Sequence, residues 1–351
     1  MSFSKDEGWR EIALKIMSGN KIRFCSAPDA LRDYCDKKII DAHTLSKSLS
    51  LKPIASPKGK VFALNSNPFT LEENFGTLSF TEIGISKASI FNGFCSTHDK
   101  DIFSPIENSE FIPSKKTLFL QTYRIICMEK FKKIAVNKSR NSINDIHDKT
   151  LANRNGEIPE EDFELLNYFL NSFKEHHKKQ EELGLRDVNQ YKEKLDEILL
   201  DEQFIRMRHK VFIISNVKIV AGSHITIEMD FNNLTLQDLS NEDELDGITF
   251  SCIATSPENG FLFFSWLNGN QTAEKFINSL EGKENKSDIL LEFIYSYSEN
   301  VFSSPEWWTG LSDEKVETLT SKANEINSKQ RDLTRATHNY SAFKIEGEFY
   351  L

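Results

Sequence analysis

Apolar residues recur at helical spacing in three stretches of the first 203 residues. Residues 5–18 place apolar side chains three and four positions apart, which predicts a short amphipathic helix. The same spacing continues from residue 115 to residue 136. Residues 160–203 are highly charged but keep apolar positions at this period, and a break near Gly184 predicts two helices forming a hairpin or arm. The middle of the chain is therefore predicted to be helical.

The period of the pattern changes after Phe204. Residues 209–231 alternate between apolar and polar side chains, which predicts two strands. Residues 248–267 predict a hairpin, because the turn residues Pro-Glu-Asn-Gly separate two apolar runs. Helices are expected near 271–281, 286–301 and 313–329, followed by a last strand at the C-terminus. This part is predicted to be an α+β domain built on an antiparallel sheet.

Together these patterns predict an α+β protein of three parts: a zinc-binding domain at 1–110, a helical region at 111–203 and an α+β domain at 204–351. A chain of 351 residues is long enough for several domains. Hydrophobic residues make up 39% and charged residues 27%, a composition typical of soluble globular proteins. The net charge of −10 excludes a strongly basic nucleic-acid footprint over the whole chain, although short basic runs leave a local one open.

No apolar run is long enough to cross a bilayer, and the N-terminus lacks the apolar core of a signal peptide. We therefore expect a cytoplasmic protein without membrane association. Cysteines in that compartment are reduced and are often buried, metal-binding or catalytic. The chain has five of them: Cys25, Cys35, Cys95, Cys127 and Cys252.

The first hundred residues contain a candidate metal site. Zinc prefers four thiolate or imidazole ligands in a tetrahedron, and Cys95 with His98 offers two of them from one helical turn. Cys25 and Cys35 are the expected partners, although nine residues separate them, and Cys35 with His43 is the rival pair. The alternative to a zinc site is that the cysteines pack as small buried hydrophobes and that His98 lies on a helix surface.

The order of these elements resembles a treble-clef zinc finger and the ββα-metal fold of the HNH endonucleases. That resemblance implies that His43 activates water for attack on a phosphodiester, and that a second divalent ion such as Mg²⁺ stabilises the developing charge. Asp41, His98 and Asp99 are then the nearest candidates to hold the second ion. HNH proteins usually have Asp-His or His-His at the base, whereas this chain has Ala42 before His43.

A second resemblance covers roughly residues 20–135. The motifs AHTL at 42–45 and ASIFNGFCSTHD at 88–99, with ENVFSSPEWW at 299–308, resemble a family of bacterial proteins for which no reaction is known. Such bacterial proteins are often accessory or phage-defence genes, so the resemblance implies a role in antiviral defence.

Two functions are expected from these observations. The first is a divergent HNH-like nuclease that cleaves nucleic acid with Zn²⁺ and a second divalent ion. The second is a non-enzymatic protein in which zinc stabilises the N-terminal domain and which binds a protein or nucleic-acid partner. Arg124 lies in an otherwise apolar helix face, so it is expected to pair with Asp99 or Glu107.

Overall fold

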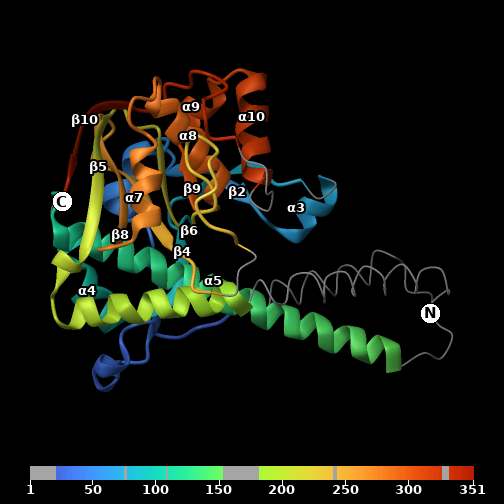
Figure 1. Ribbon diagram of the computed structural model, residues 1–351. Helices are drawn as coiled ribbons and strands as arrows, with labels where there is room; N and C mark the ends of the chain where they lie inside the picture. The colour runs from blue at the N-terminus through green and yellow to red at the C-terminus, as the bar shows by residue number, and fades with distance from the viewer. Residues whose placement is uncertain (1–20, 75–76, 108–109, 153–181, 240–242, 326–331) are drawn as a thin grey trace, which may run out of the picture.

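The computed structural model describes residues 21–74, 77–107, 110–152, 182–239, 243–325 and 332–351. The helix predicted at 5–18 lies outside these residues, as does the first half of the helical arm predicted at 160–203. The described part contains both helices and strands (Figure 1), so the predicted α+β class is confirmed. None of the described helices is both long enough and apolar enough to span a bilayer. The cytoplasmic location stays a prediction.

A large antiparallel sheet forms the centre of the molecule (Figure 1). Its eight strands have the order β10-β5-β8-β7-β6-β9-β2-β3, and each neighbouring pair is antiparallel. The hairpin predicted at 248–267 is confirmed as β7 and β8. The strands are β2 (Lys60–Asn65), β3 (Ser79–Gly84), β5 (Met207–Ser215), β6 (Ile219–Thr226), β7 (Gly247–Ala254), β8 (Asn259–Leu267), β9 (Val301–Ser303) and β10 (Lys344–Tyr350).

A second sheet has only two strands, β1 (Ile39–His43) and β4 (Ile90–Cys95). The segment between them leaves this strand pair and supplies β2 and β3 to the large sheet. The predicted boundary at residue 110 therefore does not separate two sheets, and the division into three domains stays a prediction. The same segment holds the short helices η2 (Lys47–Leu51), α2 (Lys52–Ile54) and α3 (Pro68–Glu73).

The two faces of the large sheet are covered by different helices. Adjacent residues in a strand point to opposite faces of the sheet, so Phe263 and Phe264 of β8 lie on the two different faces. Phe263 packs near Phe111, which precedes α5 (Lys115–Ala152). Phe264 packs near Phe293 of α8 (Lys286–Tyr297) on the other face. A helix over residues 182–200 lies beside α5 (Figure 1).

The helix α5 extends well past the predicted end near residue 136. The stretch beyond that point is polar, and it has no apolar periodicity that would predict a helix. Neither Gly nor Pro interrupts it, so nothing in the local sequence stops the helix. The remaining described helices are η1 (Asp29–Tyr34), α4 (Ser96–Glu107), η3 (Phe204–Arg206), α7 (Gln271–Asn278), α8 (Lys286–Tyr297), α9 (Pro305–Thr309) and α10 (Asp313–Asn324).

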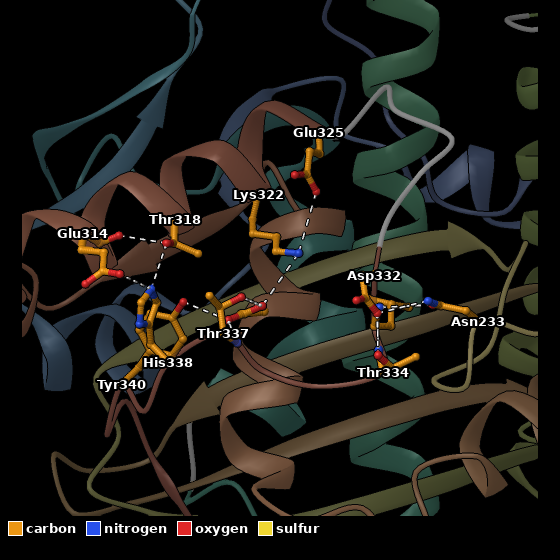
Figure 2. A network of polar contacts seen from close by, with 12 residues as sticks. Asn233, Glu314, Thr318, Lys322, Glu325, Asp332, Thr334, Thr337, His338 and Tyr340 are labelled. Carbon is orange, nitrogen blue, oxygen red and sulfur yellow. Dashed lines mark hydrogen bonds and ion pairs between the residues drawn. The ribbon is translucent and has the colours of Figure 1, made fainter.

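The segment that precedes β10 is held against α8 and α10 by a polar network (Figure 2). The buried Glu292 carboxylate of α8 accepts hydrogen bonds from the Thr337 backbone N–H at 2.6 Å and from the Tyr340 hydroxyl at 2.9 Å. Asp288, one turn earlier, accepts the Tyr340 backbone N–H at 2.8 Å. Lys322 of α10 places its ammonium group 3.8 Å from the Glu292 carboxylate. This network fixes the course of the chain into the edge strand.

Candidate metal centre

Three separate segments supply the side chains of the candidate metal centre. Cys25 and Cys35 stand on either side of η1, at the beginning and end of a surface loop. Cys95 is the last residue of β4, and His98 lies in the first turn of α4. The strand therefore ends where the helix begins, and this junction places the cysteine and the histidine side by side.

Backbone hydrogen bonds bring Cys25 to the same place. The Phe24 N–H donates to the Asn92 carbonyl at 3.2 Å, and the Ser26 N–H donates to the Gly93 carbonyl at 2.7 Å. The chain around Cys25 consequently runs along β4 and arrives beside Cys95. The Cys95 backbone N–H points at the Cys25 sulfur, 3.5 Å away.

The four side chains form one compact group. The three sulfurs and the ligand nitrogen of His98 all lie within 4.8 Å of one another. His98 Nδ1 is 3.3 Å from the Cys25 Sγ and 3.3 Å from the Cys95 Sγ. In a tetrahedral zinc site, with Zn–S near 2.3 Å and Zn–N near 2.0 Å, sulfur and nitrogen would be about 3.5 Å apart. The observed separations are within a few tenths of an ångström of that value.

The chemistry of this group fits a cation. Cys95 and His98 are buried, and burial raises the pKa of the Cys95 thiol to about 12. A nearby divalent cation reverses this effect, because it binds thiolates directly. The His98 backbone N–H already points at the Cys95 sulfur at 3.4 Å, an arrangement that favours the thiolate. Of the two His98 ring nitrogens, Nδ1 faces the Cys25 and Cys95 sulfurs and would bind the cation, while Nε2 is buried without a hydrogen-bond partner among the described residues.

Asp36 ties the loop that carries Cys35 to the helix that carries His98. Its carboxylate accepts hydrogen bonds from the Ser96 hydroxyl and from the Thr97 backbone N–H at 3.2 Å, at the start of α4. These hydrogen bonds lower the pKa of Asp36 and keep its carboxylate ionised, and the bond with Ser96 has the largest effect. Sequence reasoning missed this residue. Its only signal was an acidic residue directly after a candidate ligand cysteine.

Arg124 of α5 forms the ion pairs that the sequence predicted. Its fully buried guanidinium group is 2.8 Å from the Glu107 carboxylate and 3.4 Å from that of Asp99. It also lies over the Phe103 ring, 4.0 Å from the centroid. The predicted pairing is confirmed with both acids at once. Burial raises the pKa of Asp99, and the charge of Arg124 opposes that shift.

The candidate catalytic residues occupy three different environments. His43 ends β1, and its Nε2 is 3.4 Å from the Ile85 carbonyl oxygen. Burial lowers the pKa of His43, so the imidazole is neutral at pH 7. Asp41, on the same strand, accepts a hydrogen bond of 2.5 Å from the Asn92 amide. Asp99 faces Arg124, as described above.

The structure therefore separates two sets of candidate residues. Cys25, Cys35, Cys95 and His98 come together, and His43 lies outside their group. Over the described ranges, no other three side chains of the Cys, His, Asp or Glu type gather in this way. The second divalent ion stays a prediction.

The number of protein ligands determines whether a metal bound here could also bind a substrate. Four protein ligands complete a tetrahedron and leave no position for a substrate, as in structural zinc sites. Catalytic zinc sites keep three protein ligands and one open position.

No family model matches the chain, and comparison with curated proteins and with solved structures gives no match either.

Proposed function

We propose that this chain is a zinc-binding recognition protein in which Zn²⁺ has a structural role. The ion would be held by Cys25, Cys35, Cys95 and His98, and it would stabilise a treble-clef-like unit that binds a macromolecular partner. One observation carries the proposal, namely that four zinc-type ligand atoms lie within 4.8 Å of one another. The unit would consist of the Cys25–Cys35 loop, the antiparallel pair of β1 and β4, and α4.

A bound zinc ion would supply cross-links rather than reactivity. It would keep the three thiols deprotonated and would join segments that are up to 73 residues apart in sequence. Cross-links of this kind matter for the loop at 25–38, because most of its side chains are exposed and contribute little apolar burial. Asp36 would support the ion by holding its loop against α4.

Two observations favour recognition over catalysis. The ligand set is closed, and Asp99 is held by Arg124 rather than being directed at a second ion. His43 contacts a backbone carbonyl. A general base needs access to a water molecule that attacks the substrate, so the Ile85 contact does not by itself indicate catalysis.

A divergent HNH-like nuclease is the second candidate, and the position of His43 favours it. This residue ends the first strand of a strand–strand–helix unit made of β1, β4 and α4. Its imidazole is neutral at pH 7, as a general base requires. The nuclease would need a second divalent ion such as Mg²⁺. A role in phage defence rests on the sequence resemblance alone and stays a prediction.

Metal content tests the leading proposal. The full chain, without an added histidine tag, is purified in zinc-containing medium as wild type, Cys95→Ser and Cys252→Ser. Cys252 is a matched control, because it is also buried but its thiol points at the Ile219 carbonyl. Elemental mass spectrometry is expected to find about one zinc ion per chain in wild type and Cys252→Ser, and almost none in Cys95→Ser. A folded wild type without zinc would show the proposal to be wrong.

Cleavage assays separate the two candidates. Zinc-loaded wild type and His43→Ala are incubated with single- and double-stranded DNA and RNA in the presence of Mg²⁺ or Mn²⁺. The nuclease requires that wild type cleaves and that His43→Ala loses cleavage while it retains zinc. The recognition proposal expects no cleavage by either protein.

A further inference from the structure

The loop at 25–38, which contains Cys25 and Cys35, projects from the body of the protein. It is the blue segment at the lower left of Figure 1. Tyr34 lies at the end of η1 in this loop, and its side chain is 72% exposed. No other large hydrophobic side chain of the described residues is as exposed. Tyrosine is enriched at interfaces relative to the rest of protein surfaces, so this ring is a candidate contact residue.

The segment at 21–38, which is this loop with the four residues before it, differs from the rest of the chain in charge. Residues 21–38 contain five basic and three acidic side chains, a formal charge of +2, whereas the whole chain carries −10. All five basic side chains are exposed. Asp36 is engaged at the start of α4, and Asp29 pairs with Arg32 at 2.5 Å, which engages one charge of each sign. The basic residues are Lys21, Arg23, Arg32, Lys37 and Lys38.

The zinc site would hold this surface in a fixed conformation. Tyr34 directly precedes the candidate ligand Cys35, whose backbone N–H donates to the Arg32 carbonyl at 3.1 Å. Asp36 is the next residue. Its carboxylate accepts hydrogen bonds from the start of α4 and also from the Lys38 backbone N–H at 2.9 Å. The backbone on both sides of the tyrosine is therefore fixed. Such preorganisation lowers the entropy lost when a ligand binds.

We infer that this loop binds single-stranded nucleic acid, with a base stacked on the Tyr34 ring and phosphates near Lys37 and Lys38. The inference rests on the proposed function, because the metal fixes the loop. Base–aromatic stacking combined with neighbouring cations is the usual mode of single-strand binding, and it tolerates different sequences. A single exposed ring on a segment that also carries exposed lysine and arginine side chains does not form the apolar core of a protein interface. The six-residue η1 is too short to fill the major groove of a duplex.

Fluorescence anisotropy tests the inference with the full, zinc-loaded chain. The probes are fluorescein-labelled 12-nucleotide oligo-U RNA and oligo-dT DNA, and an unlabelled 12-base-pair duplex is the competitor. The variants are Tyr34→Ala and, as a matched control, Tyr350→Ala. Tyr350 is also an exposed tyrosine beside basic side chains, with Lys210 Nζ 4.2 Å from its ring centroid, but it lies on β10. Zinc is measured in every sample.

Wild type and Tyr350→Ala are expected to bind at least one single-stranded probe with equal affinity. Tyr34→Ala is expected to bind about ten-fold more weakly, or worse, because one stacked base is lost. The double variant Lys37→Gln/Lys38→Gln should lower the slope of log K against log salt by about 1.4, since about 0.7 is lost for each phosphate contact. The duplex should compete poorly.

Each opposite result overturns a defined part of the argument. If zinc-loaded wild type binds neither probe, or if Tyr34→Ala binds as tightly as wild type, the inference is wrong and the zinc proposal is unaffected. Equal competition by the duplex rules out single-strand recognition. Folded wild type without zinc overturns the proposed function itself, whatever the anisotropy shows.

Discussion

The candidate metal centre, in which Cys95 and His98 are buried, and the carboxylate cluster of α8 complete their polar interactions in different ways. Glu292 is 3% exposed, and its oxygens face donors from Thr337, Tyr340 and Lys322. The Cys95 sulfur, in contrast, faces the weak N–H donor of His98 and the His98 Nδ1 nitrogen, 3.3 Å away.

The difference indicates how a polar cluster that is compensated by the chain itself can be distinguished from a ligand-binding site. A buried charge is destabilising unless hydrogen bonds or an opposite charge compensate it. Around α8 the chain supplies that compensation itself, so the cluster needs nothing from outside. At the start of α4 the chain supplies ligands and the backbone N–H groups of Cys95 and His98, and the Cys95 thiol stays protonated unless a cation binds it. A set of acceptors without strong donors is therefore typical of a metal site.

Removal of the metal should have the largest effect and should affect only one of the two sites. We expect Cys35→Ser, or chelation of wild type with EDTA, to destabilise the N-terminal unit by more than about 5 kcal/mol. Hydrogen exchange followed by mass spectrometry should then show lost protection around Cys95 and His98. Protection around Thr337 and Tyr340 should persist, and equal loss at both sites would contradict the comparison.

Breaking the Arg124 ion pairs should have the next largest effect. Arg124→Met leaves the carboxylates of Asp99 and Glu107 without their buried partner, which is expected to destabilise the fold by about 3 kcal/mol. Arg208→Met is the matched control, because Arg208 pairs with Glu274 at 2.6 Å but is partly exposed. The control should lose less than about 1 kcal/mol in urea denaturation. Similar losses would show that burial of Arg124 is not decisive.

Neutralising Glu292 tests the closed network of Figure 2. In Glu292→Gln the amide nitrogen replaces an acceptor that faces Thr337 and Lys322, so a loss of about 2 kcal/mol is expected. Glu348→Gln, at a half-exposed position near Lys210 and Lys286, should change stability by less than about 1 kcal/mol. Zinc content should stay the same in both variants, and loss of zinc from Glu292→Gln would contradict the independence of the two sites.

The smallest expected effect is a change in stability with pH, measured per pH unit. It concerns His209, a buried histidine outside both sites. Its Nδ1 is 2.7 Å from the Ser265 hydroxyl, and burial lowers the pKa of His209 to about 3. The unfolded chain takes up a proton below pH of about 6.5 and the folded chain does not, so stability is complete above that pH and is lost as the pH falls toward 3.

The stability difference between wild type and His209→Gln should accordingly decrease by about 1.4 kcal/mol per pH unit below pH 6.5. Urea denaturation of both zinc-loaded proteins at several pH values measures it. Taking the difference removes the acid sensitivity of the metal ligands, which both proteins share. A constant difference from pH 7 to 4.5 would show that His209 is not held neutral.

Much of the large sheet could be predicted from local pattern. The alternation after Phe204 and the turn residues between β7 and β8 fix a hairpin over a short range of sequence. The participation of β2 and β3 could not be predicted in this way. Phe62 of β2 pairs with Ser303 of β9, and no local signal specifies a partner about 240 residues away.

The sequence by itself determined the types of ligand and one half of the candidate metal centre. A cysteine and a histidine three residues apart at the start of a helix must lie close together, whatever the rest of the fold does. Only the tertiary structure decided which side chains complete the group, because that depends on long-range backbone pairing. Ser26 bonds to Gly93 of β4, and this brings Cys25 to the site, whereas β1 carries His43 away from it to the Ile85 carbonyl.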